Sequence, residues 1–505
     1  MRLTLDLAFK HLKCKPWREV PGSPISTPEQ IFDHWLPPIL PPVIREDFLE
    51  FFQNKLAGRL NWLHSCLDPS FTEFKVVFDW GPGGYRGLPD FVDWDGQLDG
   101  QFLDHIIPLL QSIAKCTTTP LSVKQFWILA TELCKFSSFQ LKSLDIRIIQ
   151  TLSQMPTMTI PEVSRLLHVG EKKIRRRWKR LQRLNICKII ASIHYPSLGL
   201  IPVFVELFDT KSLIRSPYLI SRIELSGNAR SVLNFMVIPE EHLGSFAKTL
   251  NAHFGTAHSL FLARDLGKTM AFSHYQANAG GWNIDWRKLF IGAHLFHTTS
   301  PDSKSCPITN EPQPLPRLYI PDLKDKQIIP ILRVDARVKL EKLAKSARIS
   351  VAQASRRKTR LMELGVIQLH PTLRRVGLIE DVFIRIGERD KRLMGIIDEL
   401  PQAWIRELTG YHTGQKETLL YATLPAGSYA LMRYYLAKYL HIQAKISLAG
   451  PEIGGWPLSF DSFDFERGRW MWHEPTIVQE EAFTAFEMKT QTKEPQKELL
   501  RSEGF

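Results

Sequence analysis

The feature of this sequence that most limits its fold is an internal repeat. When the 505-residue chain is shifted by 180 positions, residues 144–152 align without gaps on residues 324–332. The same shift places residues 174–177 over residues 354–357. Because a repeated segment indicates a repeated structural unit, we expect two copies of one fold within the chain. A chain of this length also exceeds what one hydrophobic core usually supports.

Each copy begins with three stretches of helical periodicity. In copy one, apolar residues recur at three- and four-residue spacings over 144–152, over 160–167 and again from Gly170 onward. The third helix is expected to bury Ile174, Trp178 and Leu181.

Copy two repeats this pattern with three local differences. Ser350 is the expected N-cap of its third helix. Pro330 lies inside the first helix, which it is expected to kink or shorten. Lys358 stands where copy one has a core tryptophan, so either copy two is structurally looser there or the amine of Lys358 reaches outward from an apolar site.

The third helix of copy one is strongly basic. It carries one acid, Glu171, against eight basic residues, whereas solvated helices usually interleave the two signs. Two helices, a turn and a basic helix are typical of a helix-turn-helix that enters the major groove of DNA. A net charge of +13 also favours an anionic partner. The alternative, a basic face that is merely solvated, stays open. The expected DNA contacts are Lys172, Lys173, Arg175, Arg176, Arg177, Lys179 and Arg180 in copy one, and Gln353, Ser355, Arg356, Arg357 and Arg360 in copy two.

A β-rich segment follows each third helix, at 186–194 and at 366–374, and is expected to form a β-hairpin wing. A βαββαβ order comes next, which predicts a four-stranded antiparallel sheet with two helices on one face and an α+β fold class. In copy one the expected elements are strand 203–208, helix 217–223, strands 224–227 and 231–238, helix 241–254 and strand 258–263. In copy two they are strand 382–386, helix 391–400, strands 405–410 and 418–424, helix 429–440 and strand 442–448.

Several segments resemble the Lrp/AsnC family of prokaryotic transcriptional regulators. The matching residues are 349–357, Leu364-Gly365-Val366-Ile367 and Glu407-Leu408-Thr409-Gly410 in copy two, with a looser match at 170–184 and at Leu225-Ser226-Gly227 in copy one. The resemblance covers about residues 140–265 and 320–450. It implies two winged helix-turn-helix domains, each followed by a ferredoxin-like sensing module called RAM. It also implies double-stranded DNA as the partner, a small-molecule effector, and a pseudo-dimer of the two RAM modules, with further homo-oligomers left open.

The effector loops depart from the family pattern. The family usually has Asp directly after the glycine that ends the second RAM strand, whereas this chain has Asn228 and Tyr411 there. Without that carboxylate an amino acid loses a charge-assisted hydrogen bond, so ordinary amino acids are expected to bind weakly and an aromatic or anionic metabolite is favoured. The resemblance places the effector site at Gly227, Asn228, Gly410, Tyr411 and His412.

The sequence outside the repeats predicts less. Gly83-Gly84-Tyr85 echoes Gly280-Gly281-Trp282 and Gly454-Gly455-Trp456, so the N-terminal region is either a divergent third module or an unrelated helical domain. The expected organisation is an N-terminal region at 1–140, helix-turn-helix domains at 141–199 and 322–377, RAM-like domains at 200–297 and 378–475, a linker at 298–321 and a disordered tail at 476–505.

Motifs for catalysis, metals and membranes are absent from the sequence. The six cysteines and sixteen histidines form no zinc-binding or HExxH pattern, and no nucleotide-binding glycine loop follows a strand. No catalytic residue, cofactor or metal site is therefore expected, and without a signal peptide or membrane span the protein is expected to be cytoplasmic. Two alternatives stay open. One is an enzyme like the sirohaem decarboxylases, which resemble Lrp/AsnC proteins in fold, and the other is a RAM-type sensor without DNA binding.

Overall fold

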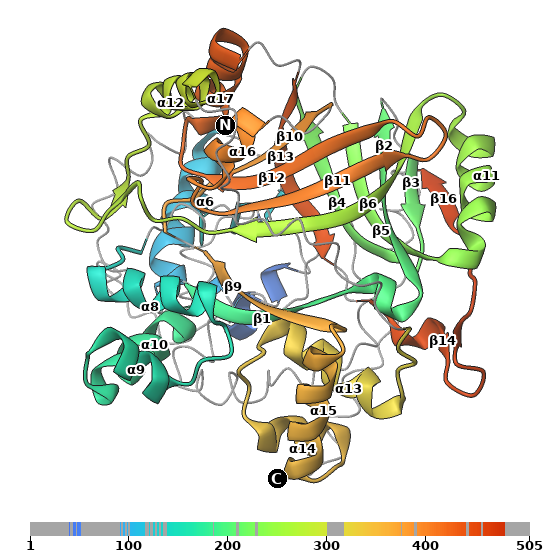
Figure 1. Ribbon diagram of the computed structural model, residues 1–505, viewed down its shortest axis with the longest axis horizontal. Coiled ribbons are helices and arrows are strands. Elements are labelled where there is room, and N and C mark those ends of the chain that lie inside the picture. The colour runs from blue at the N-terminus through green and yellow to red at the C-terminus, as the bar shows by residue number, and fades with distance from the viewer. Residues whose placement is uncertain are drawn as a thin grey trace.

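A computed structural model of the chain describes two helix-turn-helix modules beneath one β-barrel (Figure 1). The described residues are parts of 40–134, then 139–299 and 318–479, with short gaps at 185, 209–211, 228–230, 375, 388–390, 441–443 and 456–457. The fold is α+β, and its centre is an antiparallel barrel of eight strands. Within the described part of the chain, no helix is long and apolar enough to cross a membrane.

The two helix-turn-helix modules match the predicted helices closely. Ile174, Trp178 and Leu181 are buried, as the periodicity indicated. Ser350 caps the third helix of copy two, since its hydroxyl accepts the amide N–H of Gln353 at 3.2 Å. The first module consists of α8 (Ser143–Gln154), α9 (Ile160–Leu167) and α10 (Glu171–Arg183), and the second of α13 (Leu323–Val334), α14 (Leu340–Ala347) and α15 (Val351–Glu363).

Pro330 does not shorten its helix, so that part of the prediction was wrong. Helix α13 has 12 residues, as many as the equivalent α8, and runs through the proline. Pro330 and its neighbours Ile328, Ile329 and Leu332 are buried. The packing of this apolar face outweighs the one hydrogen bond that the proline cannot donate.

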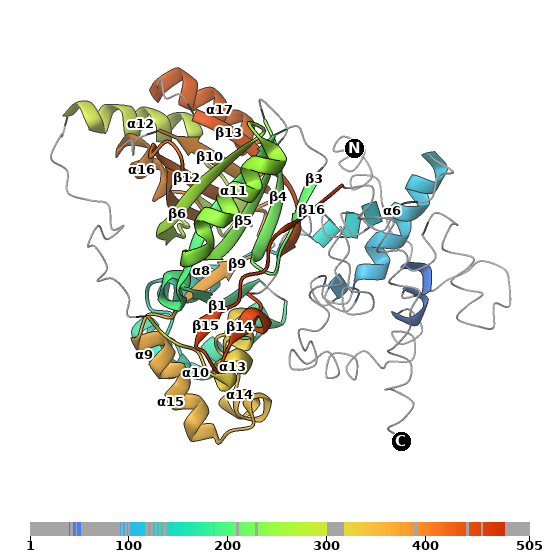
Figure 2. The same ribbon diagram turned by 90° about the vertical axis from the view of Figure 1, so that its right-hand side faces the viewer.

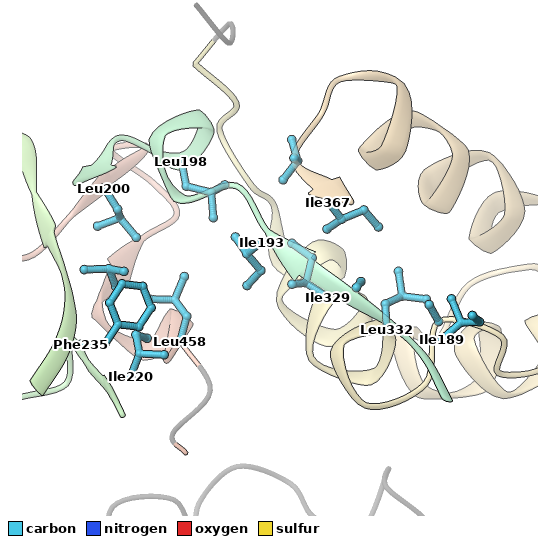
Figure 3. Close-up of a cluster of buried hydrophobic side chains, with 14 of the residues drawn as sticks. Ile189, Ile193, Leu198, Leu200, Ile220, Phe235, Ile329, Leu332, Ile367 and Leu458 are labelled. Atoms are coloured by element: carbon cyan, nitrogen blue, oxygen red, sulfur yellow. The ribbon is translucent and has the colours of Figure 1, made fainter. Parts of the chain in front are cut away.

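The predicted wings are also wrong. Strand β1 (Cys187–Ile193) and strand β9 (Ile367–Leu373) form no hairpins of their own but pair with each other, antiparallel, from Cys187↔Leu373 to Ile193↔Ile367. This two-stranded ribbon joins the two modules. Figure 3 shows Ile189, Ile193 and Ile367 of the ribbon in one apolar cluster, with barrel side chains such as Leu200 and Phe235 on one side and Ile329 and Leu332 of α13 on the other. A strand that buries every second residue needs a partner, and the other copy supplies it.

The barrel is made of two four-stranded sheets, one from each copy. Strand β6 of copy one pairs with β11 of copy two, and β13 of copy two pairs with β4 of copy one, which closes the circle. Copy one contributes β2 (Leu200–Phe208), β4 (Leu219–Ser226), β5 (Ser231–Pro239) and β6 (His258–Thr269), and copy two contributes β10 (Glu380–Ile386), β11 (Ala403–Gly410), β12 (Lys416–Leu424) and β13 (Ala444–Gly455).

One predicted helix of copy one and the start of the predicted tail are strands instead. Residues 217–223 were expected to be helical, but β4 begins at Leu219. Short apolar segments are ambiguous between helix and strand, and the β-branched Ile220 and Ile223 favour the strand. Strand β3 (Ser212–Arg215) precedes it and pairs with β16 (Thr476–Gln479), so the first four residues of the predicted disordered tail are ordered by this pairing. Residues 480–505 lie outside the described part.

The barrel is covered on its outside by helices. Helix α11 (Leu243–Phe254) packs on the sheet of copy one. The sheet of copy two has its own core, formed with α12 (Trp286–Thr299), α16 (Lys391–Ile397) and α17 (Ser428–Tyr435). This arrangement leaves the inner faces of both sheets turned toward each other.

Each copy also sends an arm across to the other copy. The indole N–H of Trp282 donates to the carbonyl of Val376 at 2.7 Å, and that of Trp470 donates to the carbonyl of Leu198, also at 2.7 Å. Both carbonyls lie where a helix-turn-helix module joins the barrel. Trp470 is therefore the structural counterpart of Trp282, because both indoles make the same kind of bond to the other copy. The Gly-Gly-Trp echo in the sequence had instead paired Trp282 with Trp456, which lies outside the described residues.

Most of the described residues of the N-terminal region are helical, and they include α6 (Phe102–Cys116). They form a separate core in which aromatic rings are stacked or set edge to face, and Figure 2 shows α6 to one side of the barrel. The predicted strand 74–80 and Gly83-Gly84-Tyr85 lie outside the described part, so a divergent third module stays a prediction. The rings of this core are those of Phe48, Phe51, Phe91, Trp94, Phe102 and Phe126.

The closed barrel predicts that the two copies stay together without a covalent link. If a protease site is placed within residues 300–317 and cut, the fragments should elute as one species with the mass of the intact chain, because two barrel seams and the ribbon cross between them. Size-exclusion chromatography with light scattering measures this, with the cleaved protein in denaturant as the control. Fragments that separate under native conditions would contradict it.

Candidate nucleic-acid surface and the interior of the barrel

The basic face of α10 is exposed to solvent. The helix is anchored by the buried Ile174, Trp178 and Leu181, which leaves the other sides of the helix free. Arg175 forms an ion pair with Glu171 one turn earlier, and the guanidinium of Arg180 lies 5.2 Å from the centre of the Phe139 ring. Six of the seven predicted DNA-contacting residues of this helix are exposed, namely Lys172, Lys173, Arg175, Arg176, Lys179 and Arg180.

Arg177, the seventh predicted residue, faces inward. Its Nε donates to Oδ1 of Asp145 at 2.7 Å, and a second bond joins its Nη2 to Oδ2, so the pair is bidentate. The side chain of Asp145, on α8, is only 1% exposed. In the second module Arg357 divides its bonds: Nη1 donates to the equally buried Asp325 at 3.0 Å, and Nη2 pairs with Asp322 at 2.7 Å. Both arginines therefore hold the third helix against the first.

This pair could have been found in the sequence. The 180-residue shift that reveals the repeat places Asp145 on Asp325 and Arg177 on Arg357. An acid and a base kept together in both copies indicate a shared structural contact. The density of basic residues on α10 concealed it, because a helix with eight of them gives no hint which one faces inward.

The corresponding surface of α15 is less basic. Arg356 and Arg360 are exposed and Ser355 is half-buried. Gln353 is exposed, but its side-chain oxygen accepts the amide N–H of Ser350 at 3.0 Å, which closes a capping box. Lys358 donates to the carbonyl of the buried Ala336 at 2.6 Å, and burial lowers its pKa, so its amine stays within the module instead of reaching outward.

The two modules contact each other beside the ribbon. The amide N–H of Ala336 donates to the carbonyl of Ile189 at 2.8 Å. Arg337 lies 5.4 Å from the Trp178 ring of the other module and donates to the carbonyls of Pro156, at 3.1 Å, and Met158. The helices α10 and α15 are therefore held in one fixed relation.

The predicted effector residues lie at the two seams of the barrel. Gly410 pairs with Phe261 at the β6–β11 seam, and a Cβ on Gly227 would come within 2.8 Å of the Ile446 carbonyl at the other seam. The rings of Tyr411 and His412 are 4.9 Å apart, and His412 lies 3.4 Å from the side-chain amide of Asn251 on α11. Asn228 lies outside the described residues. The side chains of Tyr411 and His412 do not line the cavity of about 190 Å³ inside the barrel.

Charged side chains fill one half of the barrel interior. The carboxylate of Glu206, on β2, is 1% exposed and contacts Arg385 at 2.7 Å, the amine of Lys445 and the hydroxyl of Ser231 at 2.8 Å. Burial alone would raise the pKa of Glu206, but these three partners together lower it below its usual value. The strand registers place Glu206 and Arg385 at equivalent positions of the two copies, so they meet on the pseudo-two-fold axis.

The other half of the interior holds a cavity of about 190 Å³. Side chains from both sheets form its walls, five of them aromatic. Arg406 is the charged residue of this lining, and its Nε donates to Asp265 at 2.6 Å. The lining consists of Phe204, Ser221, Ile223 and Phe235 from copy one, and Phe383, Trp404, Arg406, Leu419 and Tyr421 from copy two.

A polar cluster lies beside Arg406, between the barrel and the ribbon. Asp265 and Lys268 come from β6, and His370 comes from β9. The Lys268 amine is 3.0 Å from Nε2 of His370. Burial, assisted by the nearby Lys268, lowers the pKa of His370 to about 3, and desolvation lowers the pKa of Lys268 to about 8. Asp265 and Lys268 keep solvent-accessible side chains although protein atoms crowd around them, as groups on a concave surface do.

Sequence reasoning did not find the barrel interior. Its residues come from eight strands of two copies, and they meet only because the barrel closes.

Among the described residues, no group of three or more His, Cys, Asp or Glu side chains is placed to hold a metal ion.

No protein-family model and no curated protein matches the sequence. Among solved structures, the chain is similar to the siroheme decarboxylase NirDL, crystallised in co-complex with an iron-uroporphyrin III analogue. The TM-score is 0.34 and the identity 11%, over 64% of this chain and 96% of that one. It is also similar to PH0061, with a TM-score of 0.19 and 17% identity over 25% of this chain and 93% of that one.

The inward position of Arg177 predicts a stability effect that the exposed bases lack. Arg177→Met should lower the free energy of unfolding by about 3 kcal/mol, because it leaves the buried Asp145 carboxylate without its partner. Arg176→Met, on the exposed neighbour, should stay within about 0.5 kcal/mol of wild type. Urea denaturation followed by circular dichroism measures both. Equal stability of the two variants would rule out the structural role.

The polar cluster predicts a loss of stability in acid. The folded protein keeps His370 neutral, with a pKa of about 3, whereas the unfolded chain protonates it near the ordinary value of 6.5. Protons therefore favour the unfolded chain, and stability falls as the pH drops from about 6.5 toward 3. His370→Gln should flatten the fall in melting temperature between pH 7 and pH 5, while His473→Gln, at an exposed site, should not. The same slope in all three proteins would refute this origin.

Proposed function

We propose that this chain binds duplex DNA through α10 and α15 and acts as a transcriptional regulator. The observation that carries the proposal is the surface of α10, where six exposed basic residues cover a helix anchored by a buried apolar stripe. A helix presented in this way can enter the major groove, where arginine bonds guanine and lysine pairs with phosphate. Arg177 and Arg357 are left out of the proposed interface because their guanidinium groups hold buried aspartates.

The two modules are proposed to contribute unequally. On α10 the exposed bases follow one another around most of the helix, whereas α15 offers Arg356 and Arg360 beside the polar Ser355. Phosphate contacts supply most of the affinity of such proteins, and base contacts supply specificity. We therefore assign most of the affinity to copy one and expect an asymmetric target with two unlike halves. The ribbon and Arg337 would fix the spacing between them.

The two alternatives predicted from the sequence stay open beside this proposal. A sirohaem-decarboxylase-like enzyme would bind an added tetrapyrrole and change its absorbance spectrum. A sensor without DNA binding would fail to retain any duplex at low salt. Each of these results is distinct from that expected of a DNA-binding regulator.

The salt dependence of DNA binding tests the proposal. The triple variant with Lys172, Arg176 and Lys179 changed to Ala should bind more weakly and depend less on salt, because each lost phosphate contact reduces the slope of log K against log salt by about 0.9. Fluorescence anisotropy with a random-sequence duplex measures this slope. The salt concentration is varied from about 50 to about 200 mM, a range over which affinity from phosphate contacts falls steeply.

A matched control removes the same charge elsewhere. Lys416, Arg433 and Lys438 are exposed on the barrel module of copy two, so changing all three to Ala should keep the wild-type slope. If the α10 variant is folded and has the wild-type slope, α10 does not contact DNA and the proposal fails.

A further inference from the structure

The cavity inside the barrel has the size and the walls of a ligand site. Its volume of about 190 Å³ is somewhat larger than that of apolar protein cavities that take up benzene, about 150 Å³. Phe204 and Phe235 of copy one and Phe383, Trp404 and Tyr421 of copy two line it, so a flat ring would contact aromatic side chains of both copies. One or two fused rings fill such a space.

Arg406 is presented to this cavity with bonding capacity to spare. Its guanidinium lies over two rings, 5.3 Å from the centre of Phe204 and 4.6 Å from that of Phe235. Its Nε is bonded to Asp265. Within the described part of the chain, its two Nη groups make no further hydrogen bond. An arginine held flat and fixed at one edge is prepared to bind a carboxylate with its other edge.

The charge beside the cavity favours negative charge on the ligand. Arg406, Lys268 and the nearby Arg333 are cations, and Asp265 is the anion between Arg406 and Lys268, so positive charge is in excess at this end of the cavity. An anionic ligand reduces this excess. An amino acid would also bring an ammonium group toward Arg406, which disfavours it.

The cavity exists because the two copies differ at equivalent positions. The seam and strand registers make Ser221 equivalent to Trp404 and Ile223 equivalent to Arg406. With Trp and Arg side chains in both copies, this space would be occupied. Copy one thus leaves space with the smaller Ser221 and Ile223, and copy two provides the positive charge of Arg406 and the large ring of Trp404.

From these four observations we propose that the barrel interior binds a small planar aromatic acid of one or two rings, whose carboxylate pairs with Arg406. This site lies in the barrel, apart from the seam loops that the family resemblance indicated. It does not depend on the DNA-binding proposal, because no residue of α10 or α15 lines it.

Calorimetry on the full chain without DNA tests the site. The probes are 2-naphthoate and its neutral counterpart 2-naphthamide, with benzoate and indole-3-acetate to vary the ring. The acid should bind at least about tenfold more tightly than the amide. Arg406→Gln should weaken binding of the acid about ten- to a hundredfold, which is what one charge-assisted hydrogen bond contributes.

Two further variants keep the test decisive. Ser221→Phe fills the cavity from the equivalent position in copy one and should abolish binding of the acid without removing any charge. Arg264→Gln removes an exposed arginine on the same strand as Asp265, one that pairs with Glu407, and should leave the affinity unchanged. Thermal denaturation shows whether each variant is folded.

The proposal is overturned by any of four results. These are equal binding of acid and amide, wild-type affinity in Arg406→Gln, binding retained by a folded Ser221→Phe variant, and no binding of any of the three acids at millimolar concentration. If Arg406→Gln does not fold, the comparison of acid with amide and the Ser221→Phe variant still decide the matter.

Discussion

Strand pairing between the two copies is the interaction on which the rest of this structure depends. A four-stranded sheet has two edges with unsatisfied backbone groups, and such edges invite association with other chains. Here all four edges are used at the two seams, β6 with β11 and β4 with β13. The closed barrel creates an interior that neither copy has alone. It also fixes the two points at which the helix-turn-helix modules are joined to the barrel.

The same principle organises the region below the barrel. The ribbon of β1 and β9 satisfies two strands that would otherwise need wings, and Trp282 and Trp470 bond the backbone at Val376 and Leu198 of the opposite copy. These contacts lie between the proposed DNA surface and the barrel interior. The barrel domain of each copy thus contacts, through its tryptophan, the backbone that joins the helix-turn-helix module of the other copy to the barrel.

Local periodicity predicted most of the helices and strands, and it failed where the partner of an element is remote. Helices such as α9 match because their buried stripes and caps are encoded within a few residues. The alternating apolar pattern of residues 186–194 predicts a strand that buries one face. It does not show whether the partner strand is the next segment of the same copy, as in a hairpin, or a strand of the other copy, as in the ribbon. Arg177 was assigned to DNA because the periodicity of one crowded helix does not show which base faces a buried acid; that signal lies in the repeat, which keeps Asp and Arg at the equivalent positions of both copies. The cavity could not be predicted from either copy, since its lining alternates between the two.

The pair formed by Glu206 and Arg385 has a consequence for the ancestry of such a chain. On the axis of a true homodimer each residue meets its own duplicate, so Glu206 would face a second buried carboxylate and Arg385 would face a second, partly exposed guanidinium. Only unlike halves can place opposite charges there. Once this pair had formed, neither half could readily return to self-association, because a buried like-charge contact would replace an ion pair. The charges on the axis therefore favour pairing of the two unlike halves over pairing of either half with its own duplicate.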